Sequence, residues 1–343
     1  MSVKNLIFLI SQPRAGSTLL QRILGAHPDV HTVSEPWLML HPLYALRPDG
    51  YKAEYEEKLA STALQDFIKT LPSGDDDYVE GLRRMYGYLY TRALKDSGKR
   101  HFLDKTPRYY FIVSELYRVF PEAHYIILLR NPLAVLSSIL NSWIRKNWFS
   151  LYRFKHDFVD APRFLLDAIK LLGNRCVVVH YEQLVGDPDK EVHRICDKLG
   201  IEFVPEMVEY GRQKLSRFNL GDDEEIYRHK RPSSEKIDKW TQSLDDPQVW
   251  LLIHDYLNLL GRETIEQMGY SYEELLGKIE AYQPKQSDLR FRVPLELLIK
   301  KPEERNLAEY VMARLTTVIY QRGIWGATVA GIRKVINALS KPG

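Results

Sequence analysis

Cysteine is scarce in this chain of 343 residues, with Cys176 and Cys196 as its two members. Both lie in apolar surroundings and cannot form a disulfide framework, so the sequence predicts two buried thiols and a reducing compartment. The apolar run Leu6–Ile10 is far too short to span a bilayer, and the first residues do not form a leader peptide. We therefore expect a cytoplasmic protein without a processed leader.

Neither sign of charge dominates, because 48 basic and 45 acidic residues leave a formal net charge of +3. Nucleic-acid-binding proteins carry a larger and more concentrated basic footprint, so we expect no nucleic-acid partner. Histidine, cysteine and acidic residues do not cluster with the spacing of a metal site, and we expect no metal. The 45% of hydrophobic and 27% of charged residues suit a folded protein with a real core.

Short apolar runs alternate with helical patterns along the chain, which favours an α/β fold with a parallel sheet flanked by helices. The predicted strands are Leu6–Ser11, Tyr125–Leu129 and Cys176–His180. The predicted helices are Ser17–Ala26, Tyr51–Thr70, Tyr78–Lys95, Pro132–Lys146, Ala161–Leu172 and Gln248–Met268. Residues 212–239 read as a long polar loop, and the composition changes near residue 285. We predict a main domain of residues 1–285 and a helical C-terminal extension of residues 286–343.

The turn after the first predicted strand leads straight into a helix, an arrangement in which backbone N–H groups and the helix dipole attract anions. Compared with the phosphate-loop pattern of kinases and ATPases, the segment Ser11–Thr18 keeps Gly16 and Thr18 but has Ser17 in place of the lysine. That lysine matters for phosphoryl transfer. Arg14 offers a planar fork of donors within the loop instead. A P-loop-type anion site is therefore expected, and a kinase is not.

The sequence from Pro13 to Leu20, together with Glu35, closely resembles the 5′-phosphosulfate motif of sulfotransferases that use 3′-phosphoadenosine-5′-phosphosulfate (PAPS). The resemblance is strongest to the tyrosylprotein sulfotransferase branch and its bacterial relatives, in which a loop arginine also precedes the catalytic glutamate by 21 positions, as here (35 − 14 = 21). The resemblance implies PAPS as the donor. The loop residues that would hold its 5′-phosphosulfate are Arg14, Ala15, Gly16, Ser17 and Thr18.

Further motifs follow in the order of that family. The segment Leu103–Pro107 looks like the one that carries the catalytic lysine, here Lys105. Arg130, at the end of a predicted strand, and Ser138, eight positions later, resemble the pair that binds the 3′-phosphate. The resemblance also implies contacts to the donor by Tyr181, Ser216 and Lys230. It covers about residues 5–275.

Sulfuryl transfer to a hydroxyl requires a base for the acceptor's proton and positive charge at the leaving oxygen. We assign Glu35 as the general base, Lys105 to the leaving oxygen and Arg14 to the 5′-phosphate. The alternatives are a capping or surface role for Glu35, and for Lys105 a structural ion pair with Asp104 or another acid. His27 follows a helix within a turn, and we interpret it as structural.

The residues after Glu35 differ from those of the tyrosylprotein enzymes, which place basic residues there to read acidic peptides. Trp37, Leu38 and Met39 form an apolar stretch instead, which suits a small-molecule, glycan or lipid alcohol or phenol. Two alternatives stay open. One is a protein-tyrosine sulfotransferase, and the other is a catalytically inactive nucleotide-binding regulatory protein.

The C-terminal segment Leu307–Leu339 carries apolar residues at mostly helical spacing, and from Leu307 to the end the chain has one acid, Glu309. A basic amphipathic helix with Trp325 on its apolar side is typical of peripheral contact with an anionic membrane. The other interpretation is a helix that packs on the main domain or on a second copy of the chain in a homodimer.

Overall fold

The hydrophobic strand β1 (Leu6–Ser11) is buried along its whole length at the centre of a parallel sheet in the computed structural model. The sheet has the strand order β2-β3-β1-β4-β5, and every pair is parallel. The other strands are β2 (Val30–Thr32), β3 (His101–Lys105), β4 (His124–Leu129) and β5 (Cys176–His180). The predicted α/β fold with a parallel sheet is confirmed. The structure describes residues 5–33, 35–44, 46–47, 57–145, 147–212, 230–285, 292–309 and 311.

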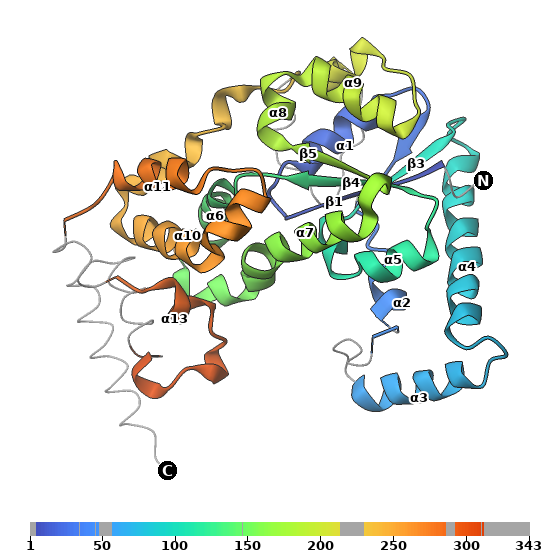
Figure 1. The fold of residues 1–343 in the computed structure, drawn as a ribbon, viewed down its shortest axis with the longest axis horizontal. Coiled ribbons are helices and arrows are strands. Elements are labelled where there is room, and N and C mark those ends of the chain that lie inside the picture. Colours follow the sequence, from blue (N-terminus) through green and yellow to red (C-terminus); the bar gives the residue numbers. More distant parts are fainter. Residues whose placement is uncertain are drawn as a thin grey trace, which may run out of the picture. The chain divides into compact units, whose positions relative to one another are not determined.

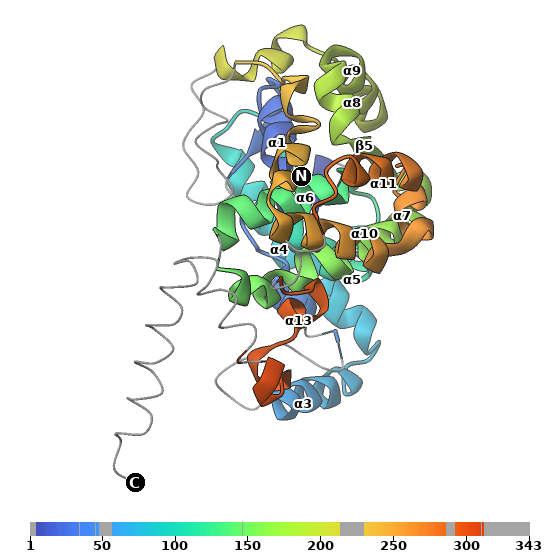
Figure 2. The ribbon, with the colours of Figure 1, turned by 90° about the vertical axis from the view of Figure 1, so that its left-hand side faces the viewer.

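The chain forms two compact units, residues 1–130 with 163–234 and residues 131–162 with 235–343. The first unit contains the whole sheet. Figures 1 and 2 show α8 (Tyr181–Gly186) and α9 (Pro188–Leu199) on one side of the sheet and α5 (Val113–Val119) on the other. A short loop joins β1 to the blue helix α1 (Ser17–Gly25). The helices of this unit are α1 (Ser17–Gly25), α2 (Leu40–Tyr44), α3 (Glu57–Lys69), α4 (Asp75–Lys95), α5 (Val113–Val119), α7 (Ala161–Leu172), α8 (Tyr181–Gly186) and α9 (Pro188–Leu199), with the 3-10 turn η2 (Pro107–Phe111) after β3.

Aromatic rings cover one face of this sheet. Phe8 of β1 lies between Tyr90 of α4 and Tyr125 of β4, with ring centroids 6.4 and 5.5 Å apart respectively. Tyr109 of η2 and Phe120, after α5, complete the cluster around Phe8 at 6.1 and 5.8 Å. Aromatic contacts at these distances stabilise a core beyond the area that they bury. This core fixes the strand ends at which the candidate site lies.

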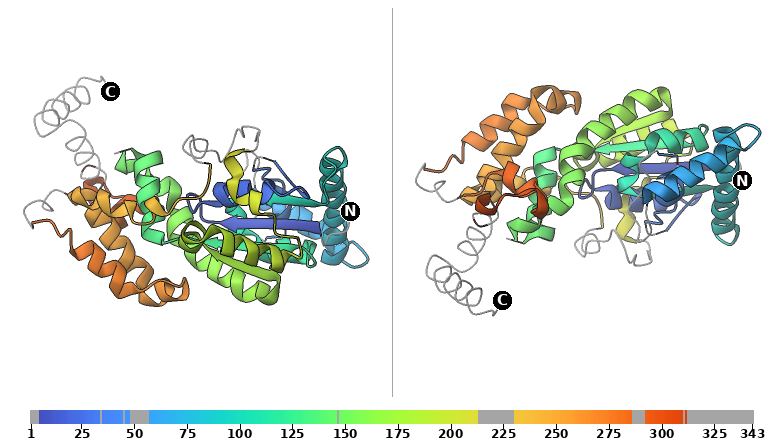
Figure 3. Two further views of the ribbon diagram at one scale, coloured as in Figure 1. Left: turned by 90° about the horizontal axis from the view of Figure 1, so that it is seen from above. Right: turned by 90° about the horizontal axis from the view of Figure 1, so that it is seen from below.

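The second unit is helical within the part of it that the structure describes, as the orange and red segments in Figure 3 show. Its helices are α6 (Pro132–Ile139), α10 (Pro247–Gln267), α11 (Tyr272–Glu280) and α13 (Leu295–Ile299), with the π turns η3 (Leu140–Ile144) and η5 (His156–Asp160) and the 3-10 helices η4 (Trp148–Phe154) and η10 (Lys239–Asp245). Gly261 interrupts α10 with φ 73° and ψ 163°, a conformation open to glycine alone. The chain therefore kinks at that residue.

Most predicted elements coincide with observed ones, although several observed helices and two strands were not predicted. The α-helix predicted over Pro132–Lys146 ends at Ile139 and continues as the π turn η3. Strands β2 and β3 were not predicted, because β2 is three residues long and β3 carries His101, Asp104 and Lys105 instead of an apolar run. The boundary at residue 285 stays a prediction, and most of the C-terminal segment, residues 312–343, lies outside the described residues.

Within the described residues, no helix is both long and apolar enough to cross a bilayer. Cys196 is buried and Cys176 half-buried, and burial raises the pKa of both thiols to about 12. Thiols with such a pKa stay protonated near neutral pH and are poor nucleophiles.

Candidate active site at the ends of β1 and β3

The loop that joins β1 to α1 adopts an unusual backbone conformation. Arg14 has φ 70° and Gly16 has φ 96°, both in the left-handed region, and a turn closes between the Gln12 carbonyl and the Ala15 N–H (3.2 Å). Gly16 caps the nine-residue helix α1 without a side-chain hydrogen bond, and the first helical residues, Ser17 and Thr18, are buried. The positive end of the helix dipole and its first N–H groups thus meet at this loop, as the sequence predicts for an anion site.

Tyr181, the first residue of α8, closes the loop from the side. A Cβ atom on Gly16 would lie 2.5 Å from Cδ2 of Tyr181, a separation that no side chain can adopt. Both this contact and the positive φ require glycine at position 16. The loop therefore depends on a residue that is 165 positions away in the sequence (181 − 16 = 165).

Arg130, at the end of β4, joins Tyr181 to the loop. Its guanidinium carbon lies 4.3 Å from the centroid of the Tyr181 ring, and Nη1 donates a hydrogen bond to the Arg14 carbonyl at 2.8 Å. The Nε–H of Arg130 is buried without an acceptor among the residues that the structure describes. A buried guanidinium donor without a partner is costly, so this nitrogen is suited to an anionic ligand.

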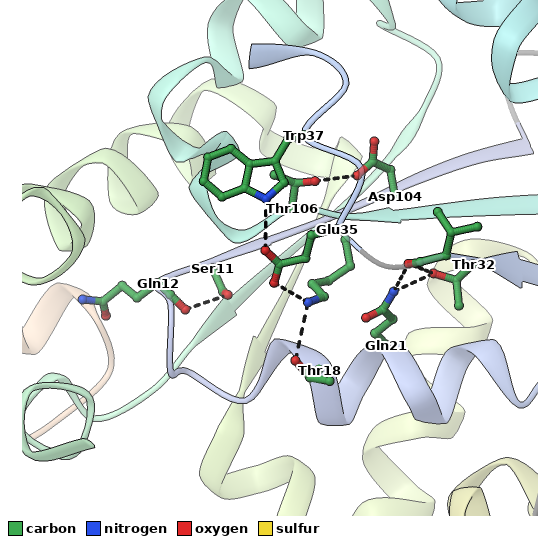
Figure 4. Close-up of polar contacts among 11 residues, drawn as sticks. Ser11, Gln12, Thr18, Gln21, Thr32, Glu35, Trp37, Asp104 and Thr106 are labelled. Atoms are coloured by element: carbon green, nitrogen blue, oxygen red, sulfur yellow. Dashed lines mark hydrogen bonds and ion pairs between the residues drawn. The ribbon is translucent and has the colours of Figure 1, made fainter. Parts of the chain in front are cut away.

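Lys105, the last residue of β3, brings the loop together with Glu35. Its Nζ lies 2.5 Å from Oε1 of Glu35 and 3.4 Å from Oγ1 of Thr18. Figure 4 draws these two contacts as the dashed lines that end at the labelled Glu35 and Thr18. The side chain of Lys105 is 1% exposed and that of Glu35 is 12% exposed. The three residues come from β3, from the segment after β2 and from the first turn of α1. The structure therefore brings Glu35, Lys105 and Thr18 to one point at the carboxyl ends of adjacent parallel strands.

The indole of Trp37 also holds Glu35. Its Nε1–H donates to Oε2 of Glu35 at 3.2 Å (Figure 4), while the guanidinium carbon of Arg108 lies 5.4 Å from the indole ring. Trp37 has φ 53°, an uncommon conformation for a bulky residue that points to a functional constraint. The sequence predicts only an apolar wall from Trp37, whereas the structure gives it a direct hydrogen bond to the candidate base.

Asp104, the neighbour of Lys105 on β3, lies on the opposite side of the strand in a fully buried cluster. Its Oδ2 accepts hydrogen bonds from the hydroxyls of Tyr90 (2.7 Å) and Tyr109 (3.0 Å), and its Oδ1 accepts one from Thr106 (2.9 Å). Burial raises the pKa of Asp104 to about 6, although these hydrogen bonds oppose the shift. Sequence reasoning missed this cluster, because its members share no local pattern.

The remaining predicted residues are Ser138, Lys230, Ser216 and His27. Ser138 is a half-buried residue of α6 in the second unit, and Lys230 is exposed in the first unit. Ser216 lies outside the described residues. His27 is buried, with Nδ1 accepting from the Asp29 N–H (3.0 Å) and Nε2 contacting the Glu202 carbonyl (2.8 Å). Both ring nitrogens thus serve the backbone, which supports the structural interpretation of this histidine.

No cluster of three or more histidine, cysteine or acidic side chains suited to a metal ion occurs among the residues for which the structure gives positions.

The sequence of this chain is similar to those of known proteins. The sequence profile described as the sulfotransferase family matches residues 6–205. The nodulation protein NoeE of Sinorhizobium fredii is 30% identical over 288 residues, which are 77% of this chain and 65% of that protein. Protein-tyrosine sulfotransferase A of Caenorhabditis elegans is 24% identical over 320 residues, 89% of this chain and 74% of that one. The chain thus spans less than two thirds of the length of the nodulation protein.

Among solved structures, the sulfotransferase domain of the Synechococcus PCC 7002 olefin synthase is 27% identical, with a TM-score of 0.44. The match covers 68% of this chain and 86% of that domain.

Proposed function

Because the chain belongs to the sulfotransferase family, we propose that it transfers a sulfuryl group from PAPS to a hydroxyl group of an acceptor. The observation that carries this proposal is the position of the Lys105 ammonium, between the carboxylate of Glu35 and the hydroxyl of Thr18. The Lys105 ammonium thus lies next to both the candidate phosphate loop and the candidate base, at the end of β3. PAPS would supply the sulfuryl group and a phosphate leaving group.

The loop residues provide the groups that a 5′-phosphosulfate requires. The backbone N–H groups of Gly16, Ser17 and Thr18, with the last two hydroxyls and Arg14, would bind it at the start of α1. Arg130 would bind the 3′-phosphate, and its buried Nε–H without an acceptor in the described structure supports this role. We keep Ala15, Ser138, Tyr181, Ser216 and Lys230 as further donor contacts on the resemblance given above.

Glu35 would act as the general base of the transfer. The acceptor oxygen attacks sulfur, its proton passes to the Glu35 carboxylate, and the bond between sulfur and the phosphate oxygen breaks. Lys105 would stabilise the negative charge that grows on that oxygen as adenosine 3′,5′-bisphosphate leaves. The contact of 2.5 Å between the Lys105 ammonium and the Glu35 carboxylate supports this pairing of a cation with a base.

The acceptor that we propose is a small-molecule, glycan or lipid hydroxyl, because the half-buried side chains of Trp37 and Leu38 give the segment after Glu35 an apolar surface. Two observations favour the protein-tyrosine alternative. Arg108 lies against the Trp37 ring and brings positive charge near the base, and several relatives are named protein-tyrosine sulfotransferases. Incubation with radiolabelled PAPS and fractionated cell extract decides between the two, since sulfate would enter either the peptide fraction or the glycan and lipid fractions.

Glu35→Gln tests the mechanism, because the amide keeps the shape of the side chain and removes the proton acceptor. We expect binding of adenosine 3′,5′-bisphosphate to stay nearly unchanged and kcat to fall by about 10²–10⁴-fold. Lys105→Ala is the matched control, because it removes the positive charge at the leaving oxygen and keeps the proposed base. A phenol with a lower pKa needs less help from a base, so it should partly restore the Glu35 variant but not the Lys105 variant. Near-normal turnover of Glu35→Gln would exclude Glu35 as the base.

A further inference from the structure

The hydroxyl of Tyr109 connects Asp104 of β3 to the backbone of Met39, two groups with no role in the proposed reaction. It donates to Oδ2 of Asp104 at 3.0 Å and accepts the backbone N–H of Met39 at 3.1 Å. Tyr109 and Met39 are both 0% exposed, so water cannot replace either contact. Met39 lies four residues after Glu35 and directly before α2, and its carbonyl accepts the Leu43 N–H (3.2 Å).

The direction of these hydrogen bonds is fixed by the chemistry of the groups. An ionised carboxylate only accepts, so the proton of the Tyr109 hydroxyl points at Asp104. The lone pairs of the same oxygen then face the Met39 N–H, which only donates. Asp104 therefore orients the hydroxyl, and the hydroxyl orients the backbone of Met39.

The chain between Glu35 and Met39 is short and stiff. Pro36 has a fixed φ, and Trp37 holds an uncommon φ of 53° while its indole N–H binds the Glu35 carboxylate. A displacement of Met39 would therefore also displace Glu35, because the backbone between them has little freedom to adjust. Misplacement of a catalytic group by about 1 Å is enough to slow a reaction about 10²-fold.

Strand β3 acts on the position of Glu35 through two of its residues, Lys105 directly and Asp104 through Tyr109 and Met39. Successive side chains of a strand point to opposite faces, so Lys105 contacts the Glu35 carboxylate directly while Asp104 faces Tyr90 and Tyr109. We propose that Tyr109, oriented by Asp104, is a positioning residue that holds the Glu35–Met39 segment and thereby sets the place of Glu35 relative to Lys105. The inference rests on the proposed function, since it assigns Glu35 the role of base.

Tyr109→Phe tests the proposal, and Tyr90→Phe is its matched control. Each substitution removes one buried hydroxyl that donates to Oδ2 of Asp104, but only Tyr109 also contacts the Met39 N–H. We expect Tyr109→Phe to lower kcat about 10-fold or more, with affinity for adenosine 3′,5′-bisphosphate within about 2-fold of the wild type. Tyr90→Phe should lose a similar amount of thermal stability and keep kcat within about 2-fold.

Two further measurements separate positioning from a general loss of structure. An acceptor phenol of lower pKa should partly restore kcat of Tyr109→Phe, since the deficit lies in proton transfer. Hydrogen exchange at the Met39 amide should be about 10-fold faster in Tyr109→Phe than in Tyr90→Phe, because its acceptor is gone.

Equal kcat values of the two variants, or equal exchange at Met39, would overturn the inference. If the wild-type protein transfers no sulfate, the proposed function fails instead. The exchange experiment then still decides whether Tyr109 holds the segment, because it needs neither donor nor acceptor.

Discussion

The buried carboxylate of Asp104 makes the stability of the protein depend on pH in a predictable direction. Its pKa in the folded protein is about 6, against the usual value of 3.8, because burial disfavours the charged form. The folded protein therefore binds this proton more tightly than the unfolded chain does. It follows that the contribution of Asp104 to stability is largest below about pH 3.8 and declines as pH rises through about 6.

The size of the effect follows from the difference of about 2 pKa units between the value of about 6 in the folded protein and the usual 3.8. At about 1.4 kcal/mol per unit, the free energy of unfolding should fall by about 3 kcal/mol over the whole window, and by about 2 kcal/mol between about pH 4.5 and about pH 7. Asp104→Asn removes the titration and keeps the shape of the side chain. Other groups titrate in both proteins, so the informative quantity is the difference between the two stability curves.

Urea unfolding of both proteins at several pH values measures this difference. We expect the stability of the wild type relative to Asp104→Asn to decrease as pH rises. Parallel curves would refute the reasoning, since they would mean that Asp104 has the same pKa in the folded and unfolded states. A relative stability that rises with pH would be a stronger contradiction, because the hydrogen bonds from Tyr90, Thr106 and Tyr109 would then outweigh burial.

Three other predictions address the donor site and the C-terminal segment. Gly16→Ala should abolish detectable binding of adenosine 3′,5′-bisphosphate by calorimetry, because its Cβ would lie 2.5 Å from the Tyr181 ring and its φ of 96° disfavours alanine. Unchanged affinity would mean that the loop has another conformation. Arg130→Ala should weaken the binding of adenosine 3′,5′-bisphosphate by about 2–5 kcal/mol. The binding of adenosine 5′-phosphosulfate, which lacks the 3′-phosphate, should change much less. Equal losses for both ligands would make Arg130 purely structural. If residues 307–343 bind membranes, the intact protein should sediment with anionic vesicles at low salt and be released at about 1 M salt, where charges are screened. A protein that never sediments with vesicles would favour packing on the main domain or on a second copy.

The central strands and several of the longer helices were predictable because their signals are local. Leu6–Ser11 and Cys176–His180 are apolar runs of strand length, and the structure has both strands with the predicted bounds. Helix α7 also has its predicted bounds, Ala161–Leu172. Strand β3 gave no such signal. Its polar residues belong to a strand because Phe102 and Leu103 pair with Leu6 and Ile7 of β1, and pairing between distant segments is not visible in a local pattern.

The candidate site was predictable to the extent that it depends on motifs. Glu35, Lys105 and Thr18 were each assigned to the site from motifs, and their side chains lie together in the structure, while their roles stay predictions. What the sequence could not indicate is the support around them. Tyr181 touches Gly16 across 165 positions, and Tyr109 reaches Met39 across 70 positions. Tyrosines are common in cores, so neither ring differs in sequence from an ordinary packing residue.

The register between β1 and β3 determines which residues of β3 face the hydrophobic core and which face the candidate site. Phe8 pairs with Asp104 and Leu9 with Lys105, so each pair shares a face of the sheet. A slip of one residue would exchange the two faces. The carboxylate of Asp104 would then meet that of Glu35, and two carboxylates at that distance repel.

The same slip would bury the ammonium of Lys105 among Phe8, Tyr90 and Tyr109, where rings and hydroxyls replace the carboxylate that now pairs with it. A buried charge without its partner costs several kcal/mol. The adjacent pair of opposite charges in β3 therefore specifies one register of the sheet. The register that it selects is the one that points the lysine at Glu35 and the phosphate loop.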